Sequence, residues 1–265
     1  MTIKRKIIIT LIILSSIIVA VLFGLLTPYY IGTVIVLISG LYYLYLIYPK
    51  FDFSKDILLN KKEKLLALTF DDGPTPGFTE EILKILTEKH VHATFFVIGK
   101  KAELHPQIVK QEIQQGSEVG AHTFNHVKLH FKKTSFIHDQ ISRTENIVKK
   151  IYSDLGVLDT YNKIFRSPHG FKNFSLKRYL KKNSFKLIPW TRGVWDTASP
   201  GSEWIVKKAT QGLAYNEILL LHDGLGMSDT VSEKQRQGVL RALPKIIDIY
   251  QSKGYRFVKV TELLK

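Results

Sequence analysis

The hydrophobic positions of this chain follow two patterns, which change at about residue 50. Residues 7–26 and 31–48 are two runs that contain no charged side chain. At a rise of about 1.5 Å per residue, a helix of either length approaches the ~30 Å thickness of a hydrocarbon core. Tyrosines stand at the ends of these runs, where interfacial aromatic side chains are expected. The pattern predicts a membrane anchor at 1–49 that consists of two transmembrane helices in a hairpin.

A secretory signal peptide is the alternative interpretation of the first run. That run is longer than the about 7–15 apolar residues of a typical signal peptide, and no small-x-small cleavage site precedes the second run. Basic residues flank the hairpin, with Lys4, Arg5 and Lys6 before it and several lysines after it. Positive charge near membrane ends favours the cytoplasmic side. We therefore expect a multi-pass protein of the cell membrane whose main domain faces the cytoplasm, with an extracytoplasmic domain as the alternative.

Short apolar runs alternate with amphipathic segments through the rest of the chain. Residues 50–62 are polar and predict a linker, and 63–265 are enough for one domain with its own core. Strands are predicted at 65–70, 93–99, 117–122, 163–167, 185–190, 217–222 and 256–260, and helices at 79–90, 106–116 and 236–254. Pro244 predicts a kink or a break in the last helix. This alternation indicates an α/β fold, and seven parallel strands favour a closed or nearly closed barrel.

Polar residues stand at the ends of these predicted strands. Asp71 and Asp72 follow the first strand, His122 ends the third, Arg166 lies in the fourth, Trp195 and Asp196 come shortly after the fifth, and His222 ends the sixth. In a βα barrel the carboxyl ends of the strands build the active site. The pattern therefore predicts an enzyme whose catalytic side chains converge on one face.

The charge balance and the lack of cysteine limit the possible functions. The chain has 38 Lys and Arg against 23 Asp and Glu, a formal net charge of +15. Such a balance suits a membrane surface or a polyanionic partner. We expect no nucleic-acid partner, because the basic residues are spread along the chain and no zinc-finger or RNA-binding motif is present. The absence of cysteine excludes disulfides, thiolate metal sites and cysteine nucleophiles.

Two histidines in the segment "GAHTFNH" form a candidate metal site. His122 and His126 can reach one point from a helical turn or a tight loop, and neutral imidazole is the commonest zinc ligand. His126 and His130 form a competing pair at the same spacing. The first pair is preferred because His122 closes an apolar strand, whereas His130 lies in a basic amphipathic stretch.

The two acids after the first strand are the second candidate for chemistry. Consecutive side chains at a strand end point to different sides, so one carboxylate can complete a metal site while the other stays free as a base. Capping of the helix that starts near Thr79 is the alternative role for Asp71 or Asp72. It is disfavoured because both acids lie too far upstream and Gly73-Pro74 intervenes.

Five short segments resemble the ordered motifs of a known enzyme family. They are "TFDDGP", "HTFNH", "RSPHG", an aspartate after an aromatic run, and "LLLHDG". Together they resemble the motifs of the NodB-type polysaccharide deacetylases, carbohydrate esterase family 4, over residues 63–263. The resemblance implies a distorted (β/α) barrel of about seven parallel strands, with 63–265 as the catalytic domain.

The resemblance also implies roles for the residues of these motifs. Asp72, His122 and His126 would bind the metal. Asp71 would be the general base paired with Arg166, and His222 would be the general acid oriented by Asp196. Leu220 would line the pocket for the acetyl methyl, and the backbone N–H of His169 would help to hold the oxyanion. Family members commonly have tyrosine or tryptophan in place of His169, and Asp-Trp in place of the segment "VWDTAS". Trp195 is a candidate for stacking on a sugar ring, with core packing as the alternative.

The predicted function is that of an N-deacetylase that uses one divalent metal ion, most simply zinc. It would hydrolyse the N-acetyl or a similar N-acyl group of an amino sugar in a polysaccharide, an oligosaccharide or a lipid-linked glycan at the membrane, which makes the lipid bilayer a partner. The alternative is a catalytically inactive, membrane-anchored protein that binds carbohydrate. An aspartyl phosphatase is set aside because Gly73 stands where the Asp-x-Asp pattern requires an acid. The exact glycan and the oligomeric state stay open.

Overall fold

The computed structural model describes residues 13–19, 28–47, 63–130, 132–171 and 173–264. The chain divides into two compact units, Met1–Tyr48 and Pro49–Lys265. The predicted linker at 50–62 lies outside the described residues.

In the first unit the predicted transmembrane hairpin is wrong. Residues 13–19 are helical, and α2 spans Pro28–Ile47. Among the described residues, no helix combines the length and the apolar character that crossing a membrane requires. The described residues 13–19 rise only about 10 Å as a helix. The predictions of a multi-pass membrane protein, of its orientation and of a lipid bilayer partner lose their basis with the hairpin.

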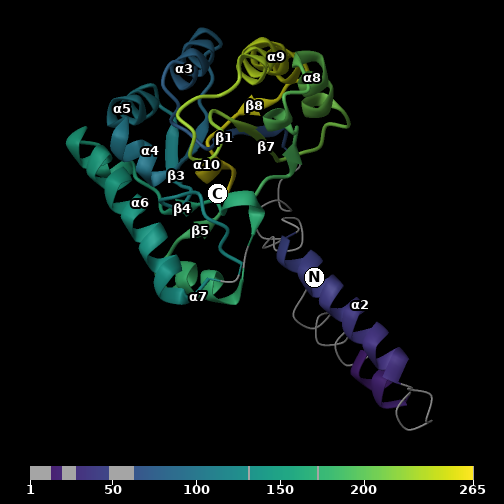
Figure 1. Ribbon diagram of the computed structural model, residues 1–265. Helices are drawn as coiled ribbons and strands as arrows, with labels where there is room; N and C mark the ends of the chain where they lie inside the picture. The colour runs from purple at the N-terminus through teal and green to yellow at the C-terminus, as the bar shows by residue number, and fades with distance from the viewer. Residues whose placement is uncertain (1–12, 20–27, 48–62, 131, 172, 265) are drawn as a thin grey trace. The chain divides into compact units, whose positions relative to one another are not determined.

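The second unit is built on one curved, parallel sheet (Figure 1). Its strands are β1 (Leu65–Asp71), β2 (Thr94–Val97), β3 (Glu118–Ala121), β4 (Ile164–Phe165), β5 (Lys186–Leu187), β6 (Arg192–Gly193), β7 (Glu217–His222) and β8 (Arg256–Phe257). The order is β5-β4-β3-β2-β1-β7-β6, and β8 pairs with the start of β1. The sheet therefore curls as a half-barrel with β5 and β6 at its edges.

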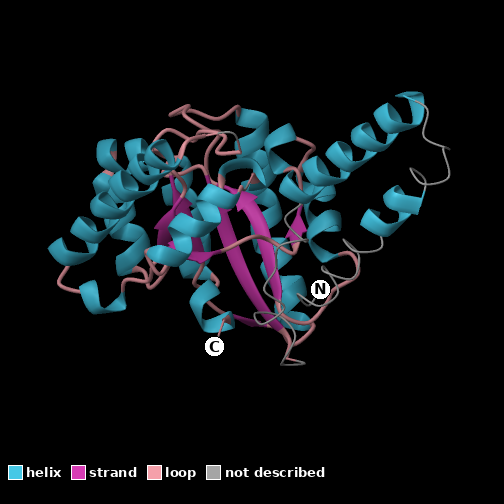
Figure 2. Cartoon of the chain, turned by 90° about the horizontal axis from the view of Figure 1, so that it is seen from below, coloured by secondary structure: helices cyan, strands magenta, loops and turns pink. Residues whose placement is uncertain are grey.

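Helices connect the strands and lie around the sheet (Figure 2). They are α3 (Phe78–Glu88), α4 (Gly99–Leu104), α5 (Pro106–Gln114), α6 (Thr134–Asp154), α7 (Phe174–Lys182), α8 (Ser202–Thr210), α9 (Glu233–Ser252) and α10 (Val260–Leu263), with the 3-10 turns η2 (Leu158–Thr160), η3 (Pro168–Gly170) and η4 (Asp196–Ala198). Every residue of β1 is buried. Burial on both faces explains why this strand reads as a continuous apolar run rather than as an alternation.

The α/β fold and the distorted barrel predicted from the sequence are confirmed, with three differences of detail. The sheet is a curled half-barrel rather than a closed or nearly closed barrel. A further two-residue strand, β6, joins β7. The helix that contains Pro244 runs unbroken from Glu233 to Ser252. Packing of its buried side chains against the core stabilises α9 across the position where proline removes one backbone hydrogen bond.

Candidate active site

The end of β1 places two carboxylates in the same site. Asp71 is the last residue of β1, and Asp72 follows it with a left-handed backbone, φ 74°. Because of this turn the two side chains do not point to opposite sides, as strand geometry alone predicts. Instead both approach His122: Asp71 Oδ2 lies 3.9 Å and Asp72 Oδ1 3.4 Å from its Nε2.

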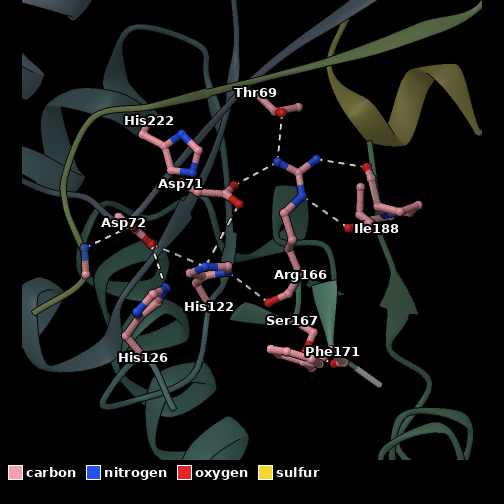
Figure 3. Close-up of polar contacts among 12 residues, drawn as sticks. Thr69, Asp71, Asp72, His122, His126, Arg166, Ser167, Phe171, Ile188 and His222 are labelled. Carbon is pink, nitrogen blue, oxygen red and sulfur yellow. Dashed lines mark hydrogen bonds and ion pairs between the residues drawn. The ribbon is translucent and has the colours of Figure 1, made fainter. Parts of the chain in front are cut away.

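A candidate metal site is formed by three side chains from two strand ends. His122 follows β3 directly, and His126 lies four residues later in the loop. One ligand atom from each of Asp72, His122 and His126 lies within 4.8 Å of the others, and His126 Nε2 is 2.9 Å from Asp72 Oδ1 (Figure 3). Burial opposes ionisation of Asp72, but the two imidazoles hold its pKa well below its usual range.

The orientation of His122 is set by the backbone of a neighbouring strand. Its Nδ1 lies 2.9 Å from the carbonyl oxygen of Arg166, so the Nε2 atom faces the two acids. A histidine that binds a metal through one nitrogen is commonly oriented by a hydrogen bond at the other. The competing residue, His130, instead stacks on Phe171 with ring centroids 4.4 Å apart.

Asp71 is paired with a fully buried arginine. Arg166 Nη1 donates to Asp71 Oδ1 at 2.7 Å and to Thr69 Oγ1 at 2.8 Å. Its Nε and Nη2 donate to the carbonyl oxygens of Ile188 and Pro189 at 3.1 and 2.9 Å. Burial lowers the pKa of Arg166, and the charge of Asp71 opposes this effect. Arg166 therefore fixes Asp71 and balances its charge, while Asp71 Oδ2 stays directed at His122 (Figure 3).

A second acid–base pair lies at the end of β7. His222 Nδ1 is 2.9 Å from Asp196 Oδ1, and the backbone N–H of His222 donates to Asp196 Oδ2 at 2.7 Å. Burial opposes the charged imidazole, but Asp196, with smaller effects from Asp72 and Asp71, raises the pKa of His222 to about 10. The arrangement favours an imidazolium whose Nε2–H is free to point away from Asp196.

The three predicted substrate-contacting residues lie around these pairs. His169 has a left-handed backbone, φ 56°, and its ring lies 4.9 Å from that of His126. No hydrogen bond among the described residues uses the His169 backbone N–H. Leu220 is buried two positions before His222 on β7, outside the core clusters that contain Leu219 and Leu221. Trp195 precedes Asp196 and is 75% exposed, so core packing does not explain it.

Two groups that contact Asp72 or the arginine paired with Asp71 were not singled out from the sequence. The hydroxyl of Thr69 accepts from Arg166, and the backbone N–H of Gly226 donates to Asp72 Oδ2 at 2.9 Å. Alternation along β1 places Thr69 on the same side as Asp71 and could have suggested the first contact. The Gly226 N–H carries no side-chain signal, because a backbone donor is the same in every residue other than proline.

Comparison with known proteins relates this geometry to a family. Residues 59–188 match the family model described as polysaccharide deacetylase. A peptidoglycan-N-acetylglucosamine deacetylase of Bacillus cereus is 33% identical over 208 residues, which cover 77% of this chain and 89% of that protein. The chain belongs to the polysaccharide deacetylase family. This confirms the family that the motifs predict.

Other relatives within the polysaccharide deacetylases differ in name and in length. A chitooligosaccharide deacetylase of Bradyrhizobium sp. is 28% identical, over 74% of this chain and 89% of that protein. The peptidoglycan-N-acetylglucosamine deacetylase PgdA of Listeria monocytogenes is 30% identical, but only 39% of its length is covered. Among solved structures, the Bc1960 peptidoglycan N-acetylglucosamine deacetylase superposes with a TM-score of 0.68 at 28% identity, over 77% of this chain and 90% of that one.

Proposed function

We propose that residues 63–265 form the catalytic domain of a metal-dependent N-deacetylase that acts on an N-acetylated amino-sugar polymer. The observation that carries this proposal is the convergence of three groups of side chains at the carboxyl ends of the strands. They are a three-ligand cluster, a carboxylate paired with arginine, and an imidazole paired with aspartate. The names of the relatives favour peptidoglycan or a chitin-like oligomer as the substrate.

The residues of the cluster fit a divalent cation. Asp72 Oδ1 is buried and accepts no hydrogen bond of good geometry, although an imidazole nitrogen lies 2.9 Å away. A buried carboxylate oxygen without a hydrogen-bond partner costs free energy unless a ligand completes it. Two imidazoles and one carboxylate are a ligand set that zinc takes in hydrolytic sites, with an open position left over. A zinc-like ion held by Asp72, His122 and His126 would supply Lewis acidity to a water and to the acyl carbonyl.

The other side chains would move the protons of an amide hydrolysis. Asp71, held by Arg166, accepts a proton from the water whose oxygen attacks the acyl carbon. The backbone N–H of His169 donates to the oxyanion that forms when the carbonyl double bond opens. His222 donates its Nε2 proton to the departing nitrogen as the C–N bond breaks, and Asp196 stabilises the imidazolium until then. The products are a free amino sugar and a carboxylic acid.

The groups around the site suit an N-acetylated sugar. Leu220 is an apolar side chain beside His222, in a position to contact the acetyl methyl group. Trp195 offers an exposed indole next to Asp196, and a flat aromatic face can stack on a sugar ring. His169 brings an imidazole where relatives commonly carry a larger aromatic ring, so we expect it to alter the width of the groove rather than the chemistry.

The proposal is tested by metal binding and product release measured on one preparation of the full chain. We expect about one zinc ion per chain by titration calorimetry, and free amine release from N-acetylglucosamine oligomers and peptidoglycan that stops on chelation and returns with zinc. Metal binding without amine release from any acetylated glycan would instead support the inactive carbohydrate-binding protein.

A matched pair of variants tests the ligand set. His126→Ala should reduce both zinc affinity and amine release sharply, whereas His130→Ala should change neither, because His130 packs on Phe171. Loss of zinc binding in His130→Ala with retention in His126→Ala would overturn the proposed ligands.

A further inference from the structure

A lysine with no exposed surface contacts the backbone of Asp72, one of the three candidate metal ligands. Lys101 is in α4, the short helix after β2, and its side chain is completely buried. Its Nζ donates to the backbone carbonyl of Asp72 at 2.7 Å and to Thr75 Oγ1 at 2.9 Å, and lies 3.5 Å from the carbonyl of Gly226. Within the described part of the chain, Lys101 makes no ion pair. The ammonium therefore joins the loops after β1 and β7 through oxygen atoms that carry no full charge.

Hydrogen bonds hold Asp72 both at its backbone carbonyl and at its side-chain carboxylate. Its carbonyl accepts from Lys101, and its Oδ2 accepts from the backbone N–H of Gly226. The backbone of Asp72 has φ 74°, a left-handed conformation that costs free energy in a residue with a side chain. With the carbonyl and one carboxylate oxygen fixed, Oδ1 is the atom left to face His122 and His126.

The packing around the ammonium leaves little room for another arrangement. A Cβ added at Gly224 would lie 2.1 Å from the Asp72 carbonyl oxygen and 2.9 Å from Lys101 Nζ. Glycine is therefore required where the β7 loop passes over this contact. Such crowding means that the carbonyl of Asp72 cannot rotate away without moving the neighbouring loop.

Negative charge from three carboxylates compensates the buried ammonium. Burial lowers the pKa of Lys101, and the charges of Asp223, Asp72 and Asp229 oppose this effect. Asp223 is itself buried, and its Oδ2 accepts from Thr79 Oγ1 at 2.7 Å. The cluster of Lys101, Asp223 and Thr79 is not used in any proton transfer of the proposed reaction, which leaves its role to be explained.

We propose that Lys101 is a positioning residue for the metal, which acts through the backbone of Asp72. By holding the Asp72 carbonyl in the left-handed turn, it presents Oδ1 to the two imidazoles before any ion arrives. This inference rests on the proposed metal centre. Partners that orient a metal ligand typically contribute about 10–100-fold in metal affinity.

The test compares Lys101→Met with Lys100→Met in the full chain, since Lys100 is the exposed neighbour in the same helix. Co²⁺ serves as the probe, with affinity from calorimetry and ligand geometry from its visible absorption. We expect Lys101→Met to bind Co²⁺ about 10–100-fold more weakly, with a shifted absorption band. Lys100→Met should match the wild type in both measurements. Circular dichroism establishes that each variant is folded.

A smaller change provides a second variant in case Lys101→Met does not fold. Thr75→Val keeps the shape of a buried side chain but removes one of the two close acceptors of the ammonium. It should weaken Co²⁺ binding by less than Lys101→Met and shift the absorption band in the same direction.

The outcomes separate this inference from the proposed function. If the wild type binds no Co²⁺, the proposed metal centre fails and the role of Lys101 fails with it. If the wild type binds Co²⁺ and folded Lys101→Met, or failing that Thr75→Val, binds it with the same affinity and spectrum, Lys101 supports only the fold. In that case the proposed function stands and the positioning role is overturned.

Discussion

The two ends of the parallel sheet differ in whether every oxygen of a buried carboxylate is paired within the protein. At the amino end, Glu118 opens β3 and Glu217 opens β7, and both are buried. Every carboxylate oxygen of these two residues accepts from the protein, with Thr94, Asn162 and Thr261 around Glu118 and Arg192, Ala214 and Tyr250 around Glu217. At the carboxyl end, Asp72 is equally buried, but its Oδ1 accepts no hydrogen bond of good geometry.

This difference separates acids that serve the fold from acids that await a ligand. A buried carboxylate whose oxygens are all paired within the protein stabilises the structure by itself. An ionised oxygen left without a partner costs free energy, which either a bound ligand or protonation of the acid can relieve. Left-handed residues occur at both ends of the sheet: His90, Ser184 and Asn216 lie shortly before strands, whereas Asp72, His126 and His169 surround the candidate site.

Among the tests of this difference between the two ends of the sheet, the largest effect is expected at Asp71, at the carboxyl end. Asp71→Asn should keep zinc binding, because the three candidate ligands are untouched, but should lose about 10²–10⁴-fold in kcat, because a carboxamide cannot accept the proton of water. Amine release and titration calorimetry on the same protein measure both quantities. The exposed acid Asp154 is the control, and Asp154→Asn should match the wild type. Full activity of Asp71→Asn would mean that another group is the base.

The pH dependence of stability should reveal the charged imidazole at the carboxyl end. The pKa of His222 is raised from 6.5 to about 10. A raised pKa stabilises the folded chain fully below pH 6.5, and the stabilisation is lost as the pH rises toward 10. Metal-free wild type should therefore lose on the order of a few kcal/mol relative to His222→Gln over this range. Urea denaturation at several pH values measures the difference. Parallel curves would show that Asp196 does not hold an imidazolium.

At the amino end, removal of a charge should affect stability and leave function intact. Glu217→Gln should lower the free energy of unfolding by about 2 kcal/mol, since a hydrogen bond to a charged group contributes about 1.5–3 kcal/mol. Zinc affinity and kcat should not change. Glu203→Gln is the control, because Glu203 pairs with Lys245 at the surface, where ion pairs contribute little. A loss of zinc binding in Glu217→Gln would contradict the separation of the two ends.

The smallest effect is expected for a buried carboxyl group away from the candidate site, and it concerns stability alone. Glu112 in α5 is completely buried, and neither of its side-chain oxygens has a hydrogen-bond partner among the described residues. Burial raises its pKa well above the ordinary value, so the free energy of unfolding falls as the pH rises from the ordinary value toward the raised pKa. Glu112→Leu should raise the free energy of unfolding by about 1 kcal/mol at neutral pH and by more at alkaline pH.

The exposed neighbour Gln111 provides the control for that change, and Gln111→Leu should leave stability unaltered. Chemical denaturation measures both variants. A decrease in stability of Glu112→Leu, or a loss of zinc binding, would show that Glu112 belongs to a site rather than being an isolated protonated acid.

The parts of the fold that could be predicted are those with a local signal. The apolar runs at 65–70 and 217–222 become β1 and β7, because strands buried on both faces need such runs. The strand β6 was not predicted, because its two residues have no apolar run of their own and are a strand only through pairing with β7. The uncharged runs near the start show the converse, since the lack of charge did not by itself establish a membrane-spanning helix.

The amino-acid sequence by itself determined the family, the α/β class with parallel strands, and the identity of the acids and imidazoles at the strand ends, because residue type and spacing are local properties. The curling of the sheet into a half-barrel was decided by the tertiary structure. Only the tertiary structure decided the left-handed turn at Asp72, the burial of Lys101 under its carbonyl and the contact of Gly226 with its carboxylate. Residues 72, 101 and 226 are far apart in the chain, and nothing in their local sequences encodes the distance between them. The closing of the β1, β2 and β7 loops over one another sets that distance, and with it the unpaired oxygen that faces the two histidines.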